Sequence, residues 1–125
     1  MSDQFPKEYH ASSLIESGRK LAVITGSGID AEAGMTTFRG EKGYYEDQEA
    51  SYLASMEALQ NEPIRQWQWY LKRFVSYHDT SPAQSHRLLA AMEEKLAEQF
   101  LGLITHNVSG LHRKAGRLKV FEIHG

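Results

Sequence analysis

The sequence contains no cysteine among its 125 residues. A disulfide framework and a cysteine-ligated zinc site are therefore excluded for this stretch of chain. We predict no metal ligands within it.

The sequence also lacks an excess of charge of one sign and any long apolar run. It has 14 basic and 16 acidic residues, a formal net charge of −2 and no basic block. Nucleic acid and anionic membranes bind basic surfaces, so neither is an expected partner. No apolar run could span a bilayer, and residues 1–10 are polar, without the apolar centre of a signal peptide. We therefore expect a soluble, cytoplasmic protein.

The main feature that is present is a short strand followed by a glycine-rich turn. Leu21–Ile24 is apolar and rich in β-branched residues, which predicts a buried strand. Residues 26–31, Gly-Ser-Gly-Ile-Asp-Ala, fit the pattern G-x-G-x-x-G/A, whose glycines permit a tight turn and let the backbone approach a pyrophosphate. The pattern predicts a nucleotide phosphate as ligand. An ordinary dehydrogenase is disfavoured, because its acidic ribose ligand is expected about 20 residues later at the end of a second strand, whereas residues 34–40 and a long helical region intervene here.

Apolar spacing and capping signals predict the remaining elements. Apolar runs indicate two further strands, at residues 100–104 and 120–123. Helical spacing and end signals indicate helices at residues 9–17, 51–60, 61–75, 81–96 and 109–115. Asn61 is the expected cap of the long central helix, and residues 81–84 the expected capping box of the next one.

Two helices carry apolar stripes that we predict to be buried. One stripe consists of Ile64, Trp67, Leu71, Phe74 and Val75, and the other of Leu88, Leu89, Met92 and Leu96. His86 lies in the first turn of its helix, where we expect a structural or capping role, and His112 is also expected to be structural.

The order of strands and helices is that of the first half of a doubly wound α/β fold with a Rossmann-like parallel sheet and a mostly helical insertion at residues 41–98. Such folds bind ligands at the carboxyl ends of their strands. Gly26, Asn107 and His124 each follow a predicted strand. We therefore expect three separate pieces of chain to meet at one crevice.

Three ordered motifs resemble those of the sirtuin family of NAD-dependent protein deacylases. Residues 26–40 resemble G-A-G-x-S-x-x-S-G-I-P-D/T-F-R-G, with matches at Gly26, Gly28, Gly34 and Thr37-Phe38-Arg39-Gly40. Residues 105–116, Thr-His-Asn-Val-Ser-Gly-Leu-His-Arg-Lys-Ala-Gly, are similar to T-Q-N-V/I-D-G-L-H-x-x-A-G, and His124-Gly125 matches H-G.

The resemblance implies a reaction in which NAD and an acyl-lysine protein or peptide react, nicotinamide leaves and the acyl group ends on ADP-ribose. It implies that His124 is the general base, a role that histidine side chains often take. It assigns cofactor contacts to Gly26, Ser27, Gly28, Thr37, Phe38, Arg39, Thr105, His106, Asn107, Val108 and Ser109. Deacetylation is the basic activity expected.

Family members also carry a four-cysteine zinc module, which the family places after the H-G motif. The sequence ends on that motif. We therefore expect residues 1–125 to be the N-terminal part of a sirtuin catalytic domain, inactive by itself and inclined to self-associate through uncovered apolar surface.

Several positions depart from the family motifs. Asp30 and Ala33 replace two serines, His106 replaces a glutamine and Ser109 replaces an aspartate that holds the nicotinamide carboxamide. A carboxylate beside a pyrophosphate is repulsive unless it points away. These departures leave open an alternative class of function, a non-catalytic NAD or ADP-ribose binding module or a degenerate sirtuin.

Tyr70 and Arg73 give a hint about the acyl group. They are three residues apart on a predicted helix and so are neighbours on its surface. The pair is similar to the Y-x-x-R of sirtuins that prefer succinyl, malonyl or glutaryl lysine, because a guanidinium and a phenol can together bind a carboxylate.

Overall fold

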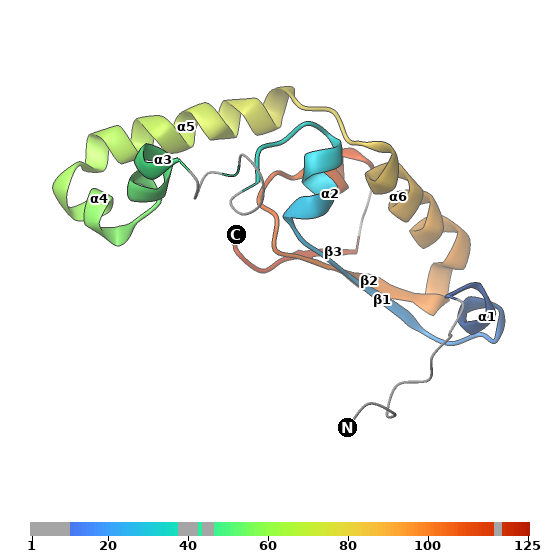
Figure 1. The fold of residues 1–125 in the computed structure, drawn as a ribbon. Helices are drawn as coiled ribbons and strands as arrows, with labels where there is room; N and C mark the ends of the chain where they lie inside the picture. Colours follow the sequence, from blue (N-terminus) through green and yellow to red (C-terminus); the bar gives the residue numbers. More distant parts are fainter. Residues whose placement is uncertain (1–10, 38–42, 44–46, 117–118) are drawn as a thin grey trace.

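The computed structural model of the protein describes residues 11–37, 43, 47–116 and 119–125. Its centre is a parallel sheet in the order β1-β2-β3 (Figure 1), formed by β1 (Leu21–Thr25), β2 (Phe100–Thr105) and β3 (Val120–Glu122). Thr25 pairs with Thr105, and Thr105 pairs with Glu122. All three strands thus end at the same edge. The predicted α/β fold with parallel strands is confirmed.

The hydrophobic core lies on one face of this sheet. Phe100, Leu103 and Val120 are buried, and α6 (Gln84–Leu96) packs on them through its partly buried Leu89, Met92 and Leu96. On the opposite face the strand side chains are exposed in the described chain, among them Ile24, Leu101 and Phe121. Leu88 is 59% exposed, so its predicted burial is wrong. Parallel sheets are usually covered on both faces, and here the described residues cover one.

The short helices predicted at residues 9–17 and 109–115 lie close to their predicted positions. Helix α1 (Ala11–Glu16) precedes the sheet and ends before Gly18, whose φ of 77° is the left-handed conformation that glycine adopts readily. Helix α2 (Ser27–Glu32) follows the glycine turn directly. Helix α7 (Leu111–Lys114) is closed by Gly116, at φ 98°, as predicted. None of the described helices is long and apolar enough to cross a membrane.

The helical insertion departs from the prediction at its helix ends. Instead of one helix at 51–60 there are two, α3 (Gln48–Leu53) and α4 (Met56–Asn61), because Ser55 starts a new helix by accepting a hydrogen bond from Ala58 N at 3.2 Å. Helix α5 (Pro63–Asp79) begins with proline as expected, but Glu62 precedes it and Asn61 ends α4. The predicted cap at Asn61 is therefore wrong.

The predicted capping box at Ser81 is also wrong. Helix α6 begins at Gln84, and its cap is Ala83, whose backbone N–H donates to Nδ1 of His86 at 3.1 Å. His86 is fully buried. Its predicted capping and structural role is confirmed.

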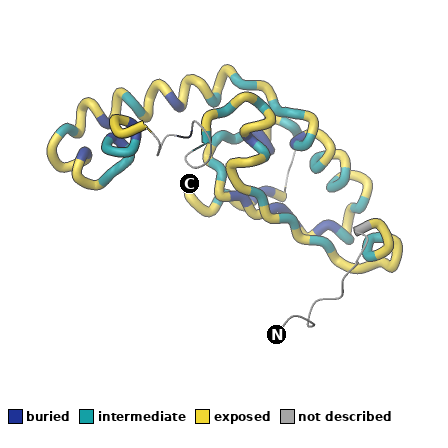
Figure 2. The backbone as a smooth tube through the Cα atoms, in the orientation of Figure 1, coloured by how far each residue is buried: buried dark blue, intermediate teal, exposed yellow. Residues whose placement is uncertain are grey.

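The apolar stripe of α5 is exposed, which contradicts its predicted burial. Ile64 is 75% exposed, Trp67 70%, Leu71 61%, Phe74 66% and Val75 51%. Figure 2 shows α5 largely in the colour of exposed residues. The buried side chains of this helix are polar: Gln66 donates to the backbone oxygens of Leu53 and Ser55, both at 2.9 Å, and Arg73 is 8% exposed. The spacing of apolar residues predicts an apolar face on α5, but it does not indicate which part of the protein packs against that face.

We predict that residues 1–125, expressed by themselves, self-associate through the exposed stripe of α5. Replacing Trp67 by lysine removes the largest exposed ring and adds a charge, so the mean particle size should fall. Light scattering over a concentration series measures this, with the Gln68→Lys variant at a neighbouring exposed position as control. A wild-type chain that stays a monodisperse monomer would contradict the prediction.

Candidate functional site

The three strand ends bring the predicted pieces of chain together. The side-chain Nδ2 of Asn107 donates to the backbone oxygen of Gly26 at 2.8 Å, which ties the loop after β2 to the glycine turn after β1. His106 Nδ1 lies 3.0 Å from His124 Nε2, which ties that loop to the end of the chain after β3. Gly26, Asn107 and His124 thus meet at one edge of the sheet, as expected from the strand pattern.

The glycine turn presents an open backbone. Gly26 has φ −133°, which any residue can adopt, and a Cβ added at Gly26 or Gly28 would meet no described atom within 4 Å. Glycine is therefore not required here by backbone conformation or by protein packing within the described residues. An unobstructed backbone is what close approach of a ligand needs.

A buried polar network supports the loop after β2. Thr25 Oγ1 donates to Thr105 Oγ1 at 2.9 Å, and Thr105 Oγ1 accepts from the backbone N–H of Asn107 at 3.1 Å. The single hydroxyl proton of Thr25 is used in this way, so Nε2 of His112, at 2.9 Å, donates to Thr25. His112 is 3% exposed, in accordance with its predicted structural role. Thr105 is 2% exposed, and its hydroxyl oxygen holds the backbone N–H of Asn107.

Asp30 is directed toward a histidine of another helix. Its Oδ1 lies 3.0 Å from Nε2 of His86, and both side chains are buried. Nδ1 of His86 accepts from Ala83 N–H, so Nε2 carries the proton and donates to the carboxylate. The Asp30 carboxylate is thus bonded to α6, and this bond joins α2, which follows the glycine turn, to that helix.

We predict that Asp30→Ala lowers the free energy of unfolding by about 1–3 kcal/mol, the usual cost of leaving a buried polar group without its partner. Asp30→Asn keeps an acceptor oxygen for His86 and should cost less. Urea unfolding followed by circular dichroism measures both, with Asp79→Ala as control because Asp79 and its partner His78 are exposed. Equal stability of Asp30→Ala and the control would contradict this role.

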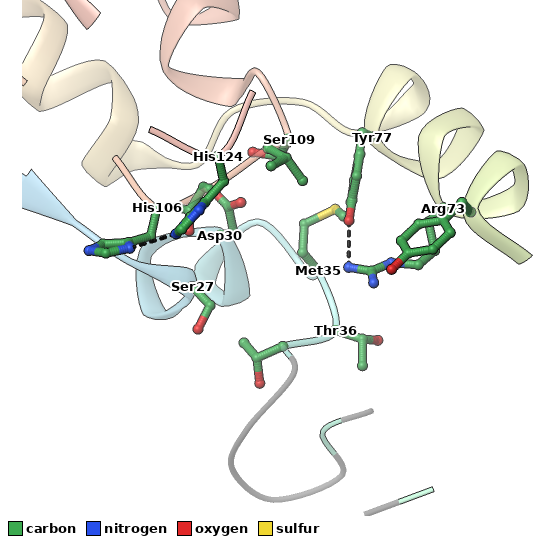
Figure 3. A pocket seen from close by; sticks show the side chains of 13 residues that line it. Ser27, Asp30, Met35, Thr36, Arg73, Tyr77, His106, Ser109 and His124 are labelled. Atoms are coloured by element: carbon green, nitrogen blue, oxygen red, sulfur yellow. Dashed lines mark hydrogen bonds between the residues drawn. The ribbon is translucent and has the colours of Figure 1, made fainter. Parts of the chain in front are cut away.

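A cavity of about 530 Å³ opens at this edge (Figure 3). Nine of the predicted site residues line it: Ser27, Thr37, Tyr70, Arg73, His106, Asn107, Val108, Ser109 and His124. His106 and His124 lie on one side of it, and Arg73 and Tyr77 on the other (Figure 3). The predicted contacts Phe38 and Arg39 lie outside the described residues. Gly26, Gly28 and Thr105 do not line the cavity.

Sequence reasoning missed Tyr77, which also lines the cavity. Arg73 Nη2 donates to the hydroxyl of Tyr77, and the guanidinium carbon lies 4.9 Å from the ring centroid of Trp69 and 5.6 Å from that of Tyr77. Two aromatic rings thus flank the cation, one turn before it and one turn after it. The sequence signal that could have identified Tyr77 is its i, i+4 spacing from Arg73, which makes the two residues neighbours on a helix.

A second cavity of about 610 Å³ adjoins the first. Both are lined by Tyr70, Arg73, Tyr77, Val108 and His124, and the second extends along α5 past Trp67 and Phe74. A ligand in one cavity and a ligand in the other would therefore meet beside His124. Within the described residues, no group of three or more His, Cys, Asp and Glu side chains could hold a metal ion.

Comparison with known proteins identifies related sequences. A family model described as the Sir2 family matches residues 26–125. The chain is 42% identical over 109 residues to the mitochondrial NAD-dependent protein deacylase sirtuin-5 of Xenopus tropicalis, covering 86% of this chain and 35% of the relative. It is 37% identical over 117 residues to an NAD-dependent protein deacylase of Aeropyrum pernix, covering 94% of this chain and 47% of that protein. The chain thus spans about a third to a half of these relatives.

Solved structures show the same fold. A Sir2 homologue in complex with ADP-ribose superposes with a TM-score of 0.79 at 30% sequence identity, covering 94% of this chain and 47% of that one. A Sir2 homologue in complex with NAD gives a TM-score of 0.75 at 32% identity, covering 94% of this chain and 46% of that one.

Proposed function

Because the chain belongs to the Sir2 family, we propose that its protein is an NAD-dependent protein-lysine deacylase of sirtuin type. The acyl group of an acyl-lysine protein or peptide would pass to ADP-ribose, with release of nicotinamide. The relatives named above are NAD-dependent deacylases, and the solved homologues bind ADP-ribose and NAD. The observation that carries the proposal is the junction of Gly26, Asn107 and His124 at one edge of the sheet, beside a cavity that Asn107 and His124 line.

The described residues suit a dinucleotide. The cavity of about 530 Å³ has the size of a small-molecule site, and the backbone at Gly26 and Gly28 faces open space where a phosphate could approach closely. Bound NAD would supply the ribose carbon and the leaving nicotinamide. Asn107 is held by Gly26 and Thr105 in a fixed position beside that space.

His124 suits the role of general base. It lines both cavities, so it borders the space for the cofactor and the space for an acyl-lysine side chain. Removing a proton from a ribose hydroxyl there would make that oxygen a better nucleophile. Ser109, which also lines the first cavity, can accept a hydrogen bond but carries no charge.

We further propose that Tyr70 and Arg73 receive a carboxylate at the end of the acyl group, such as that of succinyl, malonyl or glutaryl lysine. Both line the two cavities, and Arg73 is held between Trp69 and Tyr77. A guanidinium in a fixed position loses little freedom on binding a carboxylate.

The test is a deacylation assay on the protein expressed from its whole reading frame. Acetyl-lysine and succinyl-lysine peptides are incubated with NAD, and free nicotinamide and acyl-ADP-ribose are measured by chromatography. We expect both products in equal amounts with at least one peptide. Binding of ADP-ribose by calorimetry without turnover of any acyl peptide would instead identify a non-catalytic binding module.

A further inference from the structure

Two histidines from different strand ends share one hydrogen bond at the cavity. Nδ1 of His106 and Nε2 of His124 are 3.0 Å apart, with ring centroids 5.2 Å apart and ring planes inclined by 42°. The backbone fixes both residues: His106 N–H donates to Thr25 O at 3.1 Å, and the residue before His124, Ile123, donates to Thr105 O at 3.2 Å. The register of the sheet therefore places the two rings together.

A count of protons restricts how this bond can be made. A neutral imidazole has one N–H, so the bond between two neutral rings contains a single proton. If His106 donated, both nitrogens of His124 would be used, Nε2 as acceptor and Nδ1 as the protonated atom. His124 would then have no lone pair for a substrate proton. Only the reverse arrangement, with His124 Nε2–H donating to His106 Nδ1, leaves His124 Nδ1 free to act as a base.

We propose that His106 is a positioning residue that fixes His124 in the tautomer with a basic Nδ1. The proposal rests on the proposed function, in which His124 is the base. When Nδ1 takes a proton from a ligand hydroxyl, Nε2–H stays bonded to His106, and the bond becomes charge-assisted, which stabilises the imidazolium. His106 thus orients the base His124, just as a third residue orients the base in other catalytic sites that pair a nucleophile with a base.

The kinetic test uses His106→Leu, which removes the acceptor, and His106→Gln, whose Oε1 can accept the same bond. In the protein from the whole reading frame, His106→Leu should lower kcat by about 10- to 100-fold, the rate equivalent of one charge-assisted hydrogen bond. His106→Gln should recover most of this loss, and the KM for NAD should change little. His78→Leu is the control, since His78 is exposed on α5 and has no part in the cavities. A raised KM for NAD with unchanged kcat would overturn the proposal.

The second measurement does not depend on activity. Correlation spectra of ¹⁵N-labelled histidine report which ring nitrogen of His124 carries the proton. We expect Nε2 in the wild type and a mixture of tautomers in His106→Leu, with thermal unfolding to verify that the variant folds. Identical His124 spectra in the two proteins would overturn the proposal. An inactive wild-type protein would reject the proposed function instead, and the spectra would then decide the pairing by themselves.

Discussion

Replacing His124 by alanine is expected to lower deacylation by roughly 10²–10⁴-fold, the usual effect of losing a positioned base. NAD binding should remain largely intact, because the nucleotide contacts proposed above lie on the glycine turn and on Asn107. Asn107 keeps its bonds to Gly26 and Thr105 when the imidazole is absent. Measuring kcat and the dissociation constant for NAD on the same variant separates the two roles.

His78→Ala is the matched control for this substitution, since it removes an exposed imidazole from α5. It should leave both quantities unchanged. Deacylation by His124→Ala at a near wild-type rate would show that His124 is not the base, and the hypothesis of a non-catalytic module would gain support. Loss of NAD binding together with activity would indicate a cofactor contact instead.

The strands and the place of the site could be predicted from the sequence because both depend on local signals. Apolar runs such as Leu21–Ile24 followed by a polar turn mark a strand and its end. Parallel strands joined by helices bring their carboxyl ends to one edge, so the convergence of Gly26, Asn107 and His124 followed from chain order alone. The structure confirms both the parallel strands and this convergence.

The partners of polar side chains could not be predicted, because they are far apart in sequence. Asp30 bonds to His86, which is 56 positions away, and His106 bonds to His124 on the next strand end. Comparison with the sirtuin motifs identified Asp30 and His106 as departures from the family pattern. It did not show that each of them forms a hydrogen bond with a histidine elsewhere in the chain.

The environment of α5 is a different case. Its spacing of apolar residues predicted an amphipathic helix, and the helix exists. Which face is covered depends on what packs against it, and in the described chain the buried side chains of α5 are the polar Gln66, which bonds to the backbone of Leu53 and Ser55, and Arg73. A burial prediction from periodicity assumes a partner for the apolar face. The assumption is wrong for the described residues.

Replacing Arg73 by methionine is expected to lower the turnover of succinyl-lysine peptide by about 10- to 100-fold, the equivalent of one charged hydrogen bond, and that of acetyl-lysine peptide far less. Methionine is apolar and of similar length, so it can fill the space between Trp69 and Tyr77 that the guanidinium now occupies. The variant removes the cation while preserving the packing of α5.

The comparison of kcat/KM for the two peptides is the measurement that decides this assignment, because a general loss of folding or of NAD binding would lower both values together. Lys72→Met is the control, since it removes an exposed cation from the position directly before Arg73 on the same helix. Tyr77→Phe should have a smaller effect of the same kind, because it removes the hydroxyl that receives Arg73 Nη2 but keeps the ring beside the guanidinium. Equal losses on both peptides, or no desuccinylation by the wild-type protein, would reject Arg73 as the receptor for an acidic acyl group.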